Sequence, residues 1–130
     1  MDDLIIEKTA SSPEIHFSQG HNGLLIKGKS YMENSAQFYG PVFDWLERHL
    51  CEDGLKNIEI NMEIIYFNSS SFKMFLNLFE LLENAITRNQ CDICVNWRYD
   101  PVNRMAMEYG EELQEEVKLV KFNLVPHTPA

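Results

Sequence analysis

The chain has 130 residues and a formal net charge of −9, and this length fits one domain spanning residues 1–130. Its composition is 45% hydrophobic and 12% aromatic, which supplies enough apolar surface for a core and excludes wholesale disorder. The acidic balance repels phosphate backbones and anionic lipids, so nucleic acid and membrane surfaces are disfavoured as partners.

The amino terminus, from Met1 to Glu7, is acidic where a signal peptide would be basic, and its apolar run is too short for one. No run in the chain approaches the ~18 apolar residues of a membrane span. The cysteines Cys51, Cys91 and Cys94 are odd in number and accompany no secretory signal. We therefore expect reduced thiols in a cytoplasmic protein.

The first half of the chain predicts two strands, a helix and a further strand. Residues 13–28 alternate in polarity around a turn that ends in Asn22-Gly23, which indicates a β-hairpin. Apolar residues at helical spacing predict a helix over 34–51. Polarity alternates again from 57 to 67, and we expect Tyr66 on the buried face with the even-numbered residues before it.

The second half predicts a regular alternation of helices and strands. A helix is expected over 70–88 and an alternating strand over 91–99. Asp100-Pro101 is typical of an N-cap followed by proline at the first helical position, so we expect a helix from there to about residue 116. A last short strand is expected over 119–125.

The order β-β-α-β-α-β-α-β predicts an α/β fold whose strand–helix–strand units pair in parallel with right-handed crossovers. Parallel sheets covered on both faces have near-continuous apolar strands, whereas the strands at 57–67 and 91–99 alternate. We therefore expect the helices mainly on one face and a partly solvated opposite face. The polar residues whose exposure tests this expectation are Glu59, Asn61, Glu63, Asn96 and Arg98.

Enzyme motifs are missing from the sequence: it contains no phosphate-loop glycine pattern, no HExxH and no GxSxG. We therefore expect no catalytic residues and no cofactor.

Cys91 and Cys94 match the CxxC sequence pattern. However, residues three apart on a strand point to opposite faces, so these two thiols cannot bind the same metal ion. The histidines are far apart in the sequence, so we expect each of them to be a surface or structural residue. Glutamates between Glu108 and Glu116 indicate a solvated helix face, with a docking surface for a basic partner as the alternative.

The stretch from Asn68 to Ser71 joins a parallel strand to the start of a helix, where open α/β sheets usually carry their function. A phosphoryl group on a serine there would meet the positive end of the helix dipole. Lys73 supplies a nearby counter-charge. The alternative is structural, because serine is a favoured N-cap and the stretch can serve to cap the helix alone.

Several strings in this order and spacing resemble the SiaC family of bacterial regulatory phosphoproteins over nearly the whole chain. They are Ser12-Pro13-Glu14-Ile15, Ser30-Tyr31-Met32-Glu33-Asn34-Ser35, Asp44-Trp45-Leu46-Glu47-Arg48, Tyr66-Phe67-Asn68-Ser69-Ser70-Ser71-Phe72-Lys73, Trp97-Arg98-Tyr99-Asp100 and Glu108-Tyr109-Gly110-Glu111-Glu112.

The resemblance implies a fold like the STAS domain of anti-sigma-factor antagonists, with a mixed sheet of four to five strands. It also implies a switch protein that is not an enzyme. In that family a dedicated kinase phosphorylates the residue after the junction asparagine, so the resemblance implies phosphorylation of Ser69, with Ser70 and Ser71 as alternatives. It further implies a PP2C-type phosphatase that reverses this step, and an unphosphorylated form that stimulates a diguanylate cyclase, which raises cyclic di-GMP and favours aggregation or biofilm formation.

The partner is expected to dock beside the modified serine, and the residues we assign to this contact are Phe67, Asn68, Ser70, Phe72 and Lys73. The sequence also allows two alternative functions. The first is an anti-sigma-factor antagonist with the same switch chemistry and a different client. The second is a small enzyme or ligand-binding module, which would need a well-formed pocket with perturbed titratable groups.

Overall fold

The computed structural model describes residues 3–18, 23–50, 57–89 and 91–127. Its elements in chain order are β1 (Leu4–Ile6), β2 (Glu14–Phe17), β3 (Gly23–Ser30), α1 (Ser35–Leu50), β4 (Asn57–Phe67), α2 (Ser69–Asn89), β5 (Asp92–Tyr99), α3 (Arg104–Glu116) and β6 (Lys121–Pro126).

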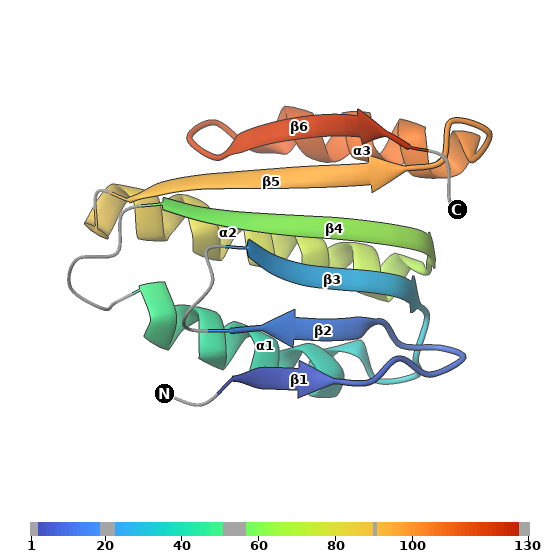
Figure 1. Cartoon of the computed structure of the whole chain (residues 1–130), viewed down its shortest axis with the longest axis horizontal. Coiled ribbons are helices and arrows are strands. Elements are labelled where there is room, and N and C mark those ends of the chain that lie inside the picture. Colours follow the sequence, from blue (N-terminus) through green and yellow to red (C-terminus); the bar gives the residue numbers. More distant parts are fainter. Residues whose placement is uncertain (1–2, 19–22, 51–56, 90, 128–130) are drawn as a thin grey trace.

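The six strands form one sheet in chain order, antiparallel from β1 to β3 and parallel from β3 to β6 (Figure 1). The predicted hairpin is confirmed by the β2–β3 pairing, although residues 19–22 of its turn lie outside the described residues. The expected count of four to five strands is wrong, because β1 adds a sixth at the edge. This strand has three residues, which is too short for an alternating pattern to predict.

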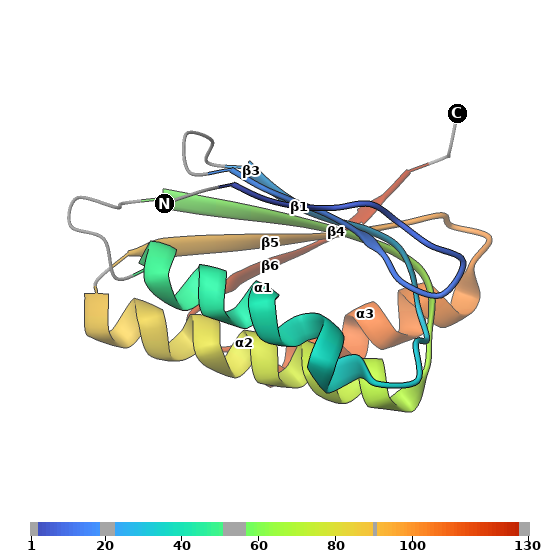
Figure 2. The same ribbon diagram turned by 90° about the horizontal axis from the view of Figure 1, so that it is seen from below.

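All three helices cover one face of the sheet (Figure 2). The five polar residues named above for the opposite face all retain solvent contact: Glu59 and Arg98 are exposed, and Asn61, Glu63 and Asn96 are half-buried. The predicted one-sided arrangement is therefore confirmed. The core lies between the sheet and the helices, and its largest fully buried side chains include Trp97, Tyr39, Phe17 and Phe75.

Three asparagines form a ladder across the open face. Asn61, Asn96 and Asn123 stand in register on β4, β5 and β6. The amide of Asn96 donates to Oδ1 of Asn61 at 3.0 Å, and the amide of Asn123 donates to Oδ1 of Asn96 at 3.0 Å. The ladder joins three neighbouring strands through side chains as well as through the backbone.

A bulge near the end of β4 overturns the expectation for Tyr66. Gly28 pairs with Ile64 and Lys29 with Tyr66, so Ile65 is an extra residue opposite β3. Because one extra residue reverses the faces of all that follow, Tyr66 is 45% exposed and Phe67 is 6% exposed. Gly28, on the other side of the bulge, has φ of 133°, which glycine adopts without steric cost.

The predicted start of the third helix is also wrong. Asn103 is the N-cap of α3, and its Oδ1 accepts the N–H of Ala106 at 3.2 Å. Asp100 instead closes a turn: its carboxylate accepts the N–H of Val102 at 3.1 Å and its carbonyl accepts that of Asn103 at 2.8 Å. Aspartate followed by proline suits the first two positions of such a turn as well as a helix start.

Glycine brings α3 close to the sheet. Gly110 is buried in α3, and a Cβ built there would lie 2.6 Å from Cδ1 of Trp97. The Trp97 indole N–H donates to the carbonyl of Ala106 at 2.9 Å, one turn earlier in α3. Tight packing and this hydrogen bond together fix the helix that flanks the carboxyl end of β4.

Candidate functional site

Asn68 connects β4 to α2 and caps the helix. Its Oδ1 accepts the N–H of Ser71 at 3.0 Å and the hydroxyl of Ser70 at 3.1 Å. Its carbonyl accepts the N–H of Phe72 at 3.0 Å, and its own N–H donates to the carbonyl of Ser30 at 3.1 Å. The capping role that the sequence allowed for a serine therefore belongs to Asn68, which leaves the serines in the first turn.

The three consecutive serines have different surroundings. Ser69 is exposed, Ser70 is half-buried with its hydroxyl bound to Asn68, and Ser71 is fully buried. An enzyme that modifies a folded protein needs an accessible hydroxyl. Ser69 is the only one of the three serines whose side chain is exposed, which distinguishes it from Ser70 and Ser71.

Ser71 belongs to a buried hydroxyl network. The hydroxyl of Ser30 donates to Ser71 Oγ at 2.7 Å and shares a 2.7 Å hydrogen bond with the Tyr39 hydroxyl. Burial raises the pKa of the Tyr39 hydroxyl, and the hydrogen bond with Ser30 opposes this shift. The network ties the first turn of α2 to the end of β3 and to α1.

Replacing Tyr39 with phenylalanine is expected to flatten the loss of stability at alkaline pH. Below about pH 10 the phenol is neutral in both the folded and the unfolded chain, so it adds no pH dependence. Above that pH the unfolded chain loses the proton first, so the free energy of unfolding falls by about 1.4 kcal/mol per pH unit for this group. Urea unfolding of wild type and Tyr39→Phe at increasing alkaline pH measures the difference, and equal slopes would contradict it.

An aromatic cluster lies beneath the junction. The ring of Phe67 stacks on Phe72 at 6.0 Å between centroids and meets Tyr109 of α3 at 4.9 Å. Phe67 is buried, Phe72 is half-buried and Lys73 is exposed. Of the residues expected to contact a partner, Phe67 therefore lies in the core, where it supports the side chains above it. The exposed Tyr109 was not among the expected contacts.

The cysteines and histidines that the structure describes take surface or structural positions. Cys91 is buried and its thiol donates to the carbonyl of Ala85, whereas Cys94 is half-buried on the open face, so the predicted divergence is confirmed. His49 is buried, and its ring lies 4.6 Å from that of Trp45. His127 pairs with Glu63, which also binds Lys27 at 3.3 Å. Cys51 and His21 lie outside the described residues.

The glutamates of α3 are all exposed, as a solvated helix face requires: Glu108, Glu111, Glu112, Glu115 and Glu116. Among residues 3–18, 23–50, 57–89 and 91–127, His, Cys, Asp and Glu side chains form no group of three that could hold a metal. Within the same ranges, no helix combines the length and the apolar content that crossing a membrane requires.

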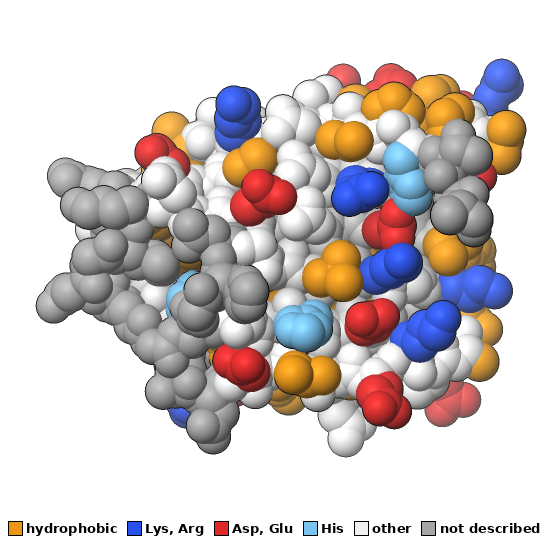
Figure 3. Space-filling model, viewed as in Figure 1, with side chains coloured by type: hydrophobic (Ala, Val, Ile, Leu, Met, Phe, Trp, Pro, Cys, Tyr) orange, Lys and Arg blue, Asp and Glu red, His pale blue; other side chains and the backbone are white. Residues whose placement is uncertain are grey.

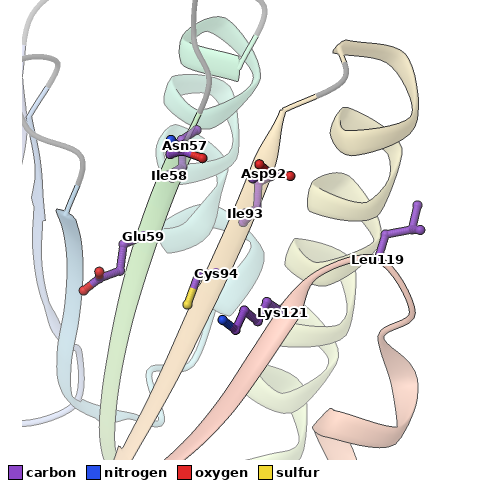
Figure 4. Close-up of a pocket in the computed structure, with 8 residues that line it drawn as sticks. All are labelled: Asn57, Ile58, Glu59, Asp92, Ile93, Cys94, Leu119 and Lys121. Atoms are coloured by element: carbon purple, nitrogen blue, oxygen red, sulfur yellow. The ribbon is translucent and has the colours of Figure 1, made fainter.

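A hollow lies at the amino ends of β4, β5 and β6, away from Ser69 (Figure 4). Lys121 reaches toward Cys94, whereas Glu59 points away toward the neighbouring strand. Burial and Glu59 raise the pKa of the Cys94 thiol, and Lys121 and Asn123 oppose them. A thiol with a raised pKa is a poor nucleophile, so this hollow does not support the enzyme alternative.

Comparison with known proteins decides the family. Residues 6–127 match the family model described as SiaC family regulatory phosphoprotein. The chain belongs to the SiaC family. An uncharacterized protein of Pseudomonas aeruginosa (strain UCBPP-PA14) is 36% identical over 116 residues, which are 89% of this chain and 90% of that protein.

Solved SiaC structures share the fold. SiaC of Pseudomonas aeruginosa is 35% identical, with a TM-score of 0.86 over 98% of this chain and 100% of that one. A second match comes from the crystal structure of the diguanylate cyclase SiaD in complex with its activator SiaC from Pseudomonas aeruginosa. It is 34% identical, with a TM-score of 0.87 over 96% of this chain and 100% of that one. The six-stranded sheet with helices on one face is therefore the SiaC architecture.

Proposed function

We propose that this SiaC-family chain is a non-enzymatic switch that binds and stimulates a diguanylate cyclase while Ser69 is unphosphorylated. Phosphorylation of Ser69 releases the cyclase and lowers cyclic di-GMP. The solved relative that activates SiaD supports the choice of client. The observation that carries the proposal is the exposed hydroxyl of Ser69 at the start of α2 in a family of regulatory phosphoproteins.

Ser69 suits a reversible phosphoryl group. It occupies the first turn of α2, where the positive end of the helix dipole favours an anion. Lys73 is exposed one turn later on the same helix and supplies a counter-charge. Ser70 and Ser71 suit the role less well, because one hydroxyl is bound to Asn68 and the other is buried.

The rest of the system follows from this role. We assign the chain, as one domain with a STAS-like fold, to the cytoplasm together with a dedicated kinase and a PP2C-type phosphatase. An anti-sigma-factor antagonist would use the same chemistry. The structural relatives reported above are SiaC proteins, one of them bound to a cyclase, so the cyclase is the favoured client.

Purification of the protein from its native host tests the proposal. Intact-mass measurement and peptide mapping are expected to place one phosphoryl group on Ser69 in part of the population. A diguanylate cyclase is expected to co-purify with the unphosphorylated fraction only. Phosphate confined to Ser70 or Ser71 would overturn the site, and recovery of an anti-sigma factor in place of a cyclase would overturn the client.

A further inference from the structure

Ser69 and Ser70 are neighbours in the first turn of α2, and charge alone cannot distinguish between them. Both follow the carboxyl end of β4. In the view of Figure 3, most of the visible Lys and Arg side chains lie toward the right, over the carboxyl ends of the parallel strands. These cations and the positive end of the helix dipole favour a phosphoryl group on either serine. A more local feature must therefore determine which of the two is modified.

Phosphoryl transfer sets a requirement for the serine that reacts. Its Oγ forms a bond to the γ-phosphorus of a nucleoside triphosphate, while the bond from that phosphorus to the bridging oxygen breaks and a nucleoside diphosphate leaves. The hydroxyl proton passes to a base of the kinase, so the hydroxyl must donate to that base in the reacting complex. A serine whose hydroxyl already donates to a neighbouring oxygen must first lose that hydrogen bond.

Asn68 holds the hydroxyl of Ser70 and leaves that of Ser69 available. The Ser70 hydroxyl donates to Oδ1 of Asn68 at 3.1 Å. Within residues 3–18, 23–50, 57–89 and 91–127, by contrast, no group hydrogen-bonds the exposed Ser69 hydroxyl. A kinase base can therefore accept the Ser69 proton without breaking a bond inside the protein, whereas the Ser70 proton must first be released.

The oxygen that holds Ser70 is fixed in place. Oδ1 of Asn68 also accepts the N–H of Ser71 at 3.0 Å, which caps α2. The backbone of Asn68 is bound on both sides, to Ser30 at 3.1 Å and to Phe72 at 3.0 Å. Turning the Asn68 side chain away would release the Ser70 hydroxyl only by breaking the helix cap at the same time.

We propose that Asn68 is a positioning residue that directs the phosphoryl group to Ser69 by holding the hydroxyl of Ser70. This role rests on the proposed function, in which Ser69 is phosphorylated. Variants expressed in the native host test it, with peptide mapping by fragment ions that separate the two serines. In Asn68→Ala, the ratio of phosphate on Ser70 to phosphate on Ser69 is expected to rise about fivefold or more, the factor that one hydrogen bond contributes.

Further variants separate the hydrogen bond to Ser70 from the helix cap. Asn68→Gly removes the acceptor at a smaller cost to the cap and is expected to shift the ratio as Asn68→Ala does. Asn68→Asp keeps an oxygen acceptor and is expected to restore the wild-type ratio. Asn34→Ala is the matched control, because Oδ1 of Asn34 accepts the N–H of Gln37 at 3.0 Å at the start of α1. This control loses a cap without releasing a serine hydroxyl, so its ratio is expected to equal that of wild type.

The outcomes distinguish this role from the proposed function. A folded Asn68→Gly protein with the wild-type ratio overturns the role of Asn68 and leaves the proposed function intact. A folded Asn68→Gly protein with no phosphate on either serine also overturns it, because the kinase would then need Asn68 itself. If wild-type protein carries no phosphate on Ser69, the proposed function fails. Circular dichroism and melting temperature establish that each variant is folded.

Discussion

Phosphorylation of Ser69 is expected to weaken cyclase binding by a factor of several thousand, which corresponds to ~5 kcal/mol. A shift of this size is what a two-state switch needs to move from mostly bound to mostly free. The physical cause is a dianion placed at an interface, where the charge must lose its hydration. Calorimetric titration of the cyclase with fully phosphorylated and unphosphorylated protein measures the difference.

Three variants separate charge from side-chain size. Ser69→Ala is expected to bind like wild type and to resist switching, because it lacks the hydroxyl. Ser69→Asp carries one charge on a shorter side chain and is expected to lose only about tenfold in affinity. Asn77→Asp adds the same charge at an exposed position two turns further along α2 and is the control. Equal affinity for wild type, phosphorylated protein and Ser69→Asp would contradict the switch.

Gly110→Ala is expected to lower the free energy of unfolding by about 2–3 kcal/mol. The added methyl group would lie 2.6 Å from Cδ1 of Trp97 and 2.8 Å from Cδ2 of Leu124. Trp97 is fully buried, and its indole N–H is committed to Ala106, so the ring cannot move aside without losing that hydrogen bond. The better helix propensity of alanine, worth up to about 1 kcal/mol, offsets only part of this cost.

Urea unfolding measures this loss, and α1 offers a control in open space. Apart from its chain neighbours, a Cβ at Gly40 in α1 would meet nothing within 4 Å. Pro41 follows Gly40 and its ring crowds the Cβ of a preceding helical residue, which offsets the gain in helix propensity, so Gly40→Ala is expected to change the free energy of unfolding by less than about 1 kcal/mol. A Gly110→Ala protein as stable as wild type would show that α3 can shift away from the sheet without penalty.

Long periodic segments could be predicted from the sequence, and local exceptions to the period could not. The alternation before Ile64 and the helical spacing after Ser71 each repeat several times, so burial of one face determines the element. The bulge at Ile65 adds a single residue with no signature of its own, and it reversed the side on which Tyr66 lies. Asp100-Pro101 was misassigned because turns and helix starts use the same residues.

The position of the candidate site could be predicted from the residue pattern, whereas the choice of Ser69 over Ser70 and Ser71 came from the family resemblance alone. A strand followed by a helix located the stretch that contains Ser69, whereas three identical residues in a row carry no information about which one is accessible. That information comes from Asn68, which binds the Ser70 hydroxyl, and from the hydroxyl network that buries Ser71. Tyr109 was missed because it comes from α3, distant in sequence, and meets Phe67 and Phe72 only in the folded chain.

The asparagine ladder has a consequence for how the strands align. Alternation of apolar and polar residues penalises a slip of one residue between neighbouring strands, but a slip of two returns every side chain to its proper face. After such a slip Asn96 would stand opposite Glu59 or Glu63 instead of Asn61, and the amide-to-amide hydrogen bond that continues the ladder to Asn61 would be lost. The ladder thus favours the native alignment over an error that hydrophobic burial alone tolerates.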